Sequence, residues 1–197
     1  MGSKTFDGVW FIAYSDDHLP EHIHGFYAET EVILELVFAE RKIRLARKAK
    51  PLNAKKSDVK RICSRSEPVH GRTHQVMGGC TTMSEWVVDI TDEDIDAAVE
   101  AAKDLTPRPT ALSAEYNRAL DLVILHIDNG QRLVIPREQL QGLEDATESQ
   151  LAQVEVKFGV DIGWPQLDVN HYLPYLLEGK YSTEKWKKAR ERRAVAA

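Results

Sequence analysis

Apolar runs alternate with polar segments along this chain, and their spacing predicts several short strands. Residues 9–14 are apolar at every position, which is typical of a central strand buried on both sides. Residues 26–38 are again mostly apolar and predict a second strand, with a bend expected near Thr30. Residues 41–47 alternate, so that Ile43 and Leu45 face one way and cationic side chains face the other.

Helical periodicity is confined to short segments with recognisable N-terminal signals. Residues 57–66 predict a short helix with Ser57 as its cap. Thr91 precedes three acidic residues and an apolar stripe, which predicts a second helix. Thr147 and Gln150 have the spacing of a capping box, and a basic helix is expected from Ser182 onward.

Two prolines, Pro107 and Pro109, interrupt both helix and sheet and predict a linker over residues 105–111. Beyond it, Asn129-Gly130 lies between two apolar runs and predicts a hairpin. We therefore expect an α+β protein of two small domains, each a short, mostly antiparallel sheet with one or two helices. The expected domains are a His-rich one with a basic strip, 1–105, and one with a basic terminal helix, 111–197.

The segment from Trp164 to Asp168 predicts a buried turn in the second domain. Trp164 is expected to pack on the sheet, because a buried aromatic beside a cap is a common device of folds. Asp168 is expected to cap a short helix that begins at Asn170 or His171 and ends near Leu177.

Composition narrows the class of protein. Of the 197 residues, 43% are hydrophobic and 29% charged, which is ordinary for a soluble globular protein. No apolar run approaches the ~18 residues of a membrane helix, and the start of the chain has no signal-peptide core. We expect a cytoplasmic protein without membrane contact, in which Cys63 and Cys80 are free thiols.

Charge is distributed unevenly behind a net charge of −5. Residues 41–65 carry eleven basic side chains and one acid, whereas residues 85–104 carry eight acids and one base. The basic strip is a candidate surface for a polyanion or an acidic protein, and the acidic helix could instead mask it internally. Within this strip we predict binding of a protein, RNA or DNA partner by Lys42, Arg44, Arg47 and Lys48.

The densest group of candidate functional side chains consists of three histidines within seven residues, His18, His22 and His24. One interpretation is structural, with the imidazoles bonded to local polar groups. A second is a metal site, with zinc as the candidate ion, because His22 and His24 share a face when the chain is extended. A third is acid–base catalysis on RNA phosphate, helped by nearby arginines. Apart from zinc, the sequence indicates no cofactor, since phosphate-binding and dinucleotide motifs are absent.

Two stretches of the chain resemble uncharacterised bacterial domain families. Residues 8–40 resemble a family marked by Asp-His-x-Pro-x-His-x-His, matched here by Asp17, His18, Pro20, His22 and His24, although Glu21 replaces a usual second proline. Residues 111–180 are similar to a family with Gly-x-x-Trp-Pro-x-Leu-Asp, for which the matches are Trp164, Pro165, Leu167 and Asp168, with Gly163 or Gly159 as the glycine.

The resemblance implies a genomic context rather than a mechanism. Genes of these two families are often neighbours and have been proposed as toxin–antitoxin-like pairs on mobile DNA. The leading hypothesis is an accessory protein of that type, which binds protein or nucleic acid through its N-terminal His/Arg surface. The alternatives are a small ribonuclease or metal-dependent hydrolase that uses His18, His22 and His24, and a pure protein-interaction module.

Overall fold

The computed structural model describes residues 2–14, 21–46, 55–66, 86–103 and 108–196. The chain divides into two compact units, the first ending at Pro107 and the second beginning at Arg108, with residues 14–16 counted in the second. Both units combine small, mostly antiparallel sheets with helices, which confirms the predicted α+β class. None of the described helices combines the length and the apolar character that a membrane span requires.

The N-terminal unit is built on one sheet, whose strands follow one another in chain order. All neighbouring strands are antiparallel except the last pair, which is parallel. The strands are β1 (Gly2–Phe6), β2 (Val9–Ala13), β3 (His22–Tyr27), β4 (Thr30–Val37), β5 (Lys42–Leu45) and β6 (Val87–Val88).

Two tight hairpins form the first four strands. Asp7 and Gly8 join β1 to β2 with φ of 46° and 80°, as a two-residue turn with positive φ at both positions requires. Ala28, with φ of 51°, takes part in the turn from β3 to β4. The prediction of one bent strand over residues 26–38 is therefore wrong, because the chain reverses at Ala28.

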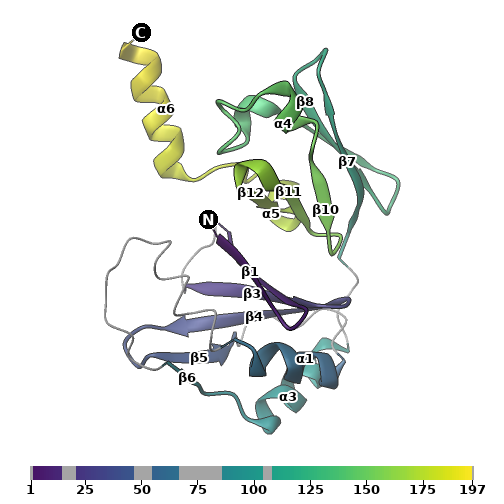
Figure 1. The fold of residues 1–197 in the computed structure, drawn as a ribbon, viewed down its shortest axis with the longest axis vertical. Helices are drawn as coiled ribbons and strands as arrows, with labels where there is room; N and C mark the ends of the chain where they lie inside the picture. Colours follow the sequence, from purple (N-terminus) through teal and green to yellow (C-terminus); the bar gives the residue numbers. More distant parts are fainter. Residues whose placement is uncertain (1, 15–20, 47–54, 67–85, 104–107, 197) are drawn as a thin grey trace. The chain divides into compact units, whose positions relative to one another are not determined.

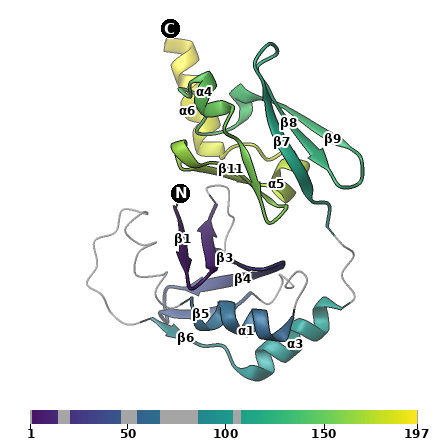
Figure 2. The same cartoon turned by 45° about the vertical axis from the view of Figure 1, so that its right-hand side comes forward.

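Two helices, α1 (Lys56–Ser64) and α3 (Asp92–Ala102), lie on the same side of this sheet (Figures 1 and 2). Val59 and Ile62 of α1 and Ile95 of α3 join the core cluster with inward residues of β2, β3, β4 and β5. Thr91 caps α3 as predicted, and it does so in a capping box with Asp94. Lys55, not Ser57, stands at the N-cap of α1 and makes no side-chain cap.

The C-terminal unit contains two three-stranded antiparallel sheets. The first has β7 (Ala111–Asn117), β8 (Leu122–Ile127) and β9 (Arg132–Pro136), and the second has β10 (Glu155–Lys157), β11 (Asp161–Trp164) and β12 (Val169–Tyr172). Its helices are α4 (Glu148–Leu151), α5 (Leu173–Leu177) and α6 (Glu184–Ala196), with 3₁₀ turns η1 (Arg137–Gln139) and η2 (Pro165–Leu167).

Local signals in this unit were partly sufficient to predict its elements. The hairpin at Asn129-Gly130, the capping box of Thr147 and the burial of Trp164 are confirmed; the indole N–H of Trp164 donates to the Leu151 carbonyl at 3.1 Å. Asp168 does not begin a helix as expected: it ends η2 in a left-handed conformation with φ of 51°. The following residues pair with β11 as β12, so the predicted helix begins only at Leu173.

Candidate functional site

His22 and His24 lie within β3, rather than in the connection before it. Ile23 between them belongs to the core cluster with the two helices, so both histidines project from the opposite face of the sheet. Their ring centroids are 5.2 Å apart. His24 is fully buried and His22 is 8% exposed. The sequence expectation that the two imidazoles share a face is met because the segment is extended.

His24 forms a buried pair with Glu31 of β4, with 2.8 Å between Nδ1 and Oε1. In the register of β3 and β4, His24 is opposite Ile33 and Glu31 is opposite Phe26, so the pair is diagonal. A carboxylate on Nδ1 fixes the orientation and the tautomer of an imidazole. Such a histidine–carboxylate pair occurs both for structural histidines in a protein interior and for histidines that act on a ligand.

A polar row crosses three strands beside this pair. His22 is opposite Glu35 on β4, and Glu35 is opposite Arg44 on β5. Directly opposed side chains in antiparallel strands have Cβ atoms about 5 Å apart. The sheet therefore places an imidazole, a carboxylate and a guanidinium on one face. Glu35 on β4 lies between His22 on β3 and Arg44 on β5.

Arg44 and Lys42 are held by two carboxylates at the far edge of the sheet. Arg44 donates through Nε to Asp89 at 3.0 Å and through Nη2 to Glu40 at 2.8 Å, and Lys42 Nζ lies 3.1 Å from Asp89. The hydrogen bond to Asp89 raises the pKa of Arg44, and bonds from Lys42 and Arg44 lower the pKa of Asp89. These two cations are partnered within their own unit.

Acidic residues of α3 neutralise the basic face of α1 in the same way. Lys60 Nζ lies 2.8 Å from an oxygen of Asp92, and Lys56 pairs with Asp96. The hydrogen bond from Lys60 lowers the pKa of Asp92, and the bond to Asp96 raises the pKa of Lys56. The interpretation that the acidic helix masks part of the basic strip is confirmed for these two lysines.

Three of the predicted site residues, His18, Arg47 and Lys48, lie outside the described residues. Among those that the structure describes, no group of three or more histidine, cysteine or acidic side chains has an arrangement that could hold a metal ion. The catalytic and metal-binding roles of His18, His22 and His24 stay predictions.

The carboxylates of the site were missed by sequence reasoning. Glu31 and Glu35 alternate with apolar residues inside a strongly apolar strand, which places them on one face of the sheet. A buried acid in such a strand requires a partner, and that requirement could have indicated the pairing of Glu31 with a histidine. Asp89 could not be found in this way, because it is remote in sequence from Arg44.

Comparisons with known proteins bear on the C-terminal unit. Residues 113–182 match the model of a family described as a protein of unknown function (DUF2442). A search of curated proteins finds no match. This segment of the chain is thus similar to a family whose function is described as unknown.

Two solved structures are similar to part of the chain. One is a protein of unknown function from Rhodospirillum rubrum, with 37% identity, covering 41% of this chain and 98% of its own, at a TM-score of 0.39. The other is an uncharacterised protein from Chromobacterium violaceum, with 26% identity, covering 41% of this chain and 75% of its own, at a TM-score of 0.38.

Proposed function

We propose that this chain is a bacterial accessory protein of the toxin–antitoxin or mobile-element type, which acts in the cytoplasm by binding a protein partner. The C-terminal family match supports membership of an uncharacterised domain class. The N-terminal motif around His22 and His24 supports the pairing of two such domains in one polypeptide. The proposal assigns partner binding to the N-terminal unit, with the C-terminal unit as a docking or regulatory module.

The observation that carries the proposal is that His24 and Arg44 are both paired with carboxylates of their own unit. A ribonuclease without metal needs a reachable proton acceptor and cations that stabilise the charge developing on phosphorus. Here His24 is fully buried against Glu31, and the guanidinium of Arg44 is bound by Asp89 and Glu40. This arrangement favours a recognition surface with fixed side chains over a site that reacts.

A protein partner is favoured over nucleic acid by the same ion pairs. Binding of a polyanion gains free energy when unpaired lysines and arginines contact phosphates and the counterions of those phosphates are released into solution. Lys42, Arg44, Lys56 and Lys60 already have carboxylate partners. A mixed surface of cations and acids recognises a complementary mixed surface, which is typical of protein interfaces.

The test is a pull-down from lysate of the host bacterium at low and high salt, together with an RNA cleavage assay. We expect one protein to be retained at low salt, released at high salt, and lost with K42E/R44E. The matched control is Lys103→Glu, since Lys103 is an exposed cation that pairs only with Glu100 of its own helix in the described structure. Retention by K42E/R44E, or loss with Lys103→Glu alone, would contradict the proposed surface.

A small ribonuclease or metal-dependent hydrolase is the second candidate, favoured by the 5.2 Å separation of the His22 and His24 rings. That function requires RNA cleavage by the wild type which disappears in His22→Ala and His24→Ala. Its metal-dependent form also requires zinc in protein purified without a histidine tag. An inert, zinc-free wild type would exclude both forms.

A further inference from the structure

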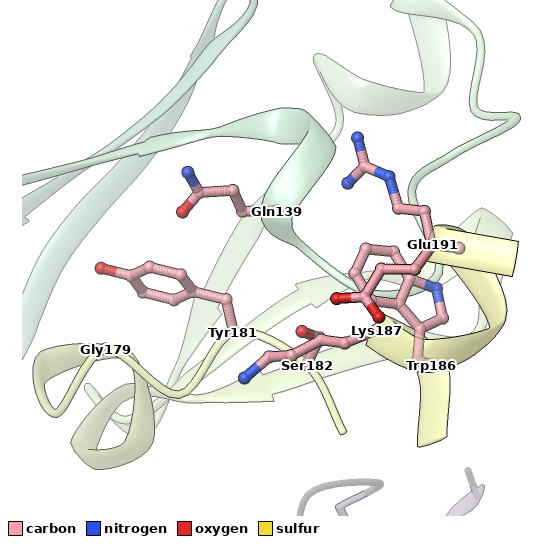
Figure 3. A pocket seen from close by; sticks show the side chains of 8 residues that line it. Gln139, Gly179, Tyr181, Ser182, Trp186, Lys187 and Glu191 are labelled. Carbon is pink, nitrogen blue, oxygen red and sulfur yellow. The ribbon is translucent and has the colours of Figure 1, made fainter. Parts of the chain in front are cut away.

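A cavity of about 500 Å³ lies within the C-terminal unit at the start of α6 (Figure 3). Side chains from η1, from the segment before α6 and from α6 itself project around it. The residues that carry the argument are Gln139, Tyr181, Ser182, Trp186, Lys187 and Arg190. Its volume is within the range of about 300–1,000 Å³ that is usual for ligand sites.

The first turn of α6 is fixed to the body of the unit, so this wall of the cavity is formed in advance. Gln141 Oε1 accepts from the backbone N–H of Thr183 at 2.9 Å and from its hydroxyl at 3.0 Å. The Thr183 hydroxyl in turn accepts from the N–H of Trp186 at 3.2 Å, which caps the helix. Further along, Arg190 Nη2 lies 3.0 Å from Glu138 Oε2. A site held in place in this way loses little conformational entropy on binding.

The chemistry of the walls suits a peptide. Tyr181 and Trp186 provide large, rigid apolar surfaces of the kind that dominate the binding energy of protein interfaces. The amide of Gln139 offers both a donor and an acceptor, and the hydroxyl of Ser182 does the same, which matches the peptide groups of a partner segment.

The charge around the cavity selects an acidic segment. Lys187 lies on its wall with its side chain 47% exposed, and its Nζ is 2.9 Å from Glu184 Oε1 of the same helix, an exposed pair of the weak kind that a ligand carboxylate can replace. The helix carries six basic residues against two acids, in a chain whose net charge is −5. Lys185, Lys188 and Arg192 follow one stripe of α6, and the described residues give them no ion pair, in contrast to the paired lysines of α1. Such a local excess of positive charge steers an acidic partner toward the site.

Single-stranded nucleic acid fits the same walls less well. The guanidinium of Arg190 lies over the ring of Trp186, 5.4 Å from its centroid, and so occupies one face on which a base would stack. Carboxylates also surround the site: Glu191 is on its wall, and Glu144 accepts from the indole of Trp186. A phosphate backbone carries a charge at every nucleotide and would bring charges beside these acids, whereas a peptide can direct one carboxylate to Lys187 and place uncharged groups beside Glu191 and Glu144.

We propose that this cavity binds a short acidic peptide segment of a protein partner, with an apolar anchor between Tyr181 and Trp186 and a carboxylate on Lys187. The inference rests on the proposed function, in that it assumes a protein partner, but it adds a second docking point on the C-terminal unit.

The test is fluorescence anisotropy on the full chain with a fluorescein-labelled peptide, Ser-Asp-Glu-Phe-Glu-Asp-Leu-Ser. A peptide with Asn and Gln in place of the acids and a labelled decauridylate are the comparison probes. We expect the acidic peptide to bind, and Lys187→Gln to weaken it about tenfold, as loss of a hydrogen bond to a charged group does. Lys187→Arg should restore binding, and the matched control Lys185→Gln, on the other side of α6, should leave it within about twofold.

Three results would overturn the assignment: no binding of the acidic peptide, equal losses in Lys187→Gln and Lys185→Gln, or tighter binding of decauridylate. Helical circular dichroism of each variant shows that α6 is retained. A failed titration with an intact salt-sensitive pull-down would remove this cavity and leave the proposed function standing. Binding of the acidic peptide to the cavity, together with a pull-down that K42E/R44E does not affect, would support the cavity and contradict the proposed N-terminal surface.

Discussion

Gly25 on β3 lies so close to Ile62 on α1 that a Cβ added to the glycine would be 2.5 Å from Ile62 Cγ2. The same Cβ would lie 3.0 Å from Cε1 of Phe11 on the neighbouring strand β2. All three residues surround the contact between the sheet and the helix that covers it, and Phe11 and Ile62 are core residues. The position of α1 on the sheet thus depends on the absence of a side chain at Gly25.

Gly25→Ala is expected to lower the free energy of unfolding of the N-terminal unit by about 2 kcal/mol, because overpacking forces the helix or the ring to move. Urea denaturation measures the change. Ile62→Leu in the same chain should recover part of the loss, since leucine lacks the Cγ2 methyl that the added Cβ would meet. An unchanged midpoint in Gly25→Ala would show that the helix is not seated on this strand.

Breaking the His24–Glu31 pair should destabilise the N-terminal unit strongly. Glu31→Ala leaves a buried imidazole without its carboxylate, which costs about 3 kcal/mol in comparable buried pairs. The double substitution His24→Leu/Glu31→Leu should lie closer to the wild type, because it removes both polar groups. Urea denaturation with hydrogen exchange on β3 and β4 reports both. The matched control is Glu115→Ala, which breaks an exposed pair with His126 at 3.4 Å and should change stability little.

Burial lowers the pKa of His171 to about 4, from an ordinary value of 6.5. The unfolded chain therefore takes up a proton as the pH falls below 6.5, while the folded unit resists protonation down to about 4. The contribution of His171 to the stability of the C-terminal unit should fall across this window by up to about 3 kcal/mol. In His171→Asn this contribution should disappear, as measured by urea midpoints between pH 7 and pH 4. A variant that keeps the same slope would contradict the buried neutral imidazole.

Asp161 acts in the opposite direction. Burial raises its pKa to about 7, from an ordinary value of 3.8, and a hydrogen bond from Asn170 at 2.8 Å only partly offsets this rise. The folded unit thus holds a proton that the unfolded chain releases, so its contribution to stability is lost as the pH rises from about 3.8 to 7. Asp161→Asn should steepen the acid lability caused by His171. Equal slopes in the wild type and Asp161→Asn would contradict the shift.

Cys63 should be inert in the folded protein. It is 3% exposed, and burial raises the pKa of its thiol to about 12, so almost no reactive thiolate exists at neutral pH. In a Cys80→Ser chain, in which Cys63 is the remaining cysteine, iodoacetamide should label the protein only after urea unfolding. Rapid labelling of the native chain would show that α1 leaves the sheet readily.

Elements with a local chemical signal could be predicted from the sequence. Thr91 and Thr147 cap their helices through residues three positions later, and Asn129-Gly130 needs no distant partner to turn. The turn at Ala28 was missed because alanine carries no signal for its positive φ, which the pairing of β3 with β4 imposes. The strand β7 was missed because its residues alternate only weakly, and its pairing with β8 decides its conformation.

The candidate site was predictable only as a set of residue types. The period of two along an extended segment was enough to place His22 and His24 together. The position of Arg44 relative to these histidines depends on the register of three strands. The carboxylate that binds Arg44 belongs to Asp89, which is 45 positions away in the sequence. The cavity beside α6 had no sequence signal at all, because Gln139 and Trp186 come together only when the helix is fixed to the body.

The chain-order arrangement of the N-terminal sheet also bears on how it assembles during synthesis. The strands up to β5 pair with their immediate predecessors, so they can form as soon as Leu45 has left the ribosome. Strand β6 must wait for Val88, and it arrives together with Asp89. Until then Arg44 and Lys42 lack this carboxylate, and the nascent protein presents a more cationic edge than the finished one.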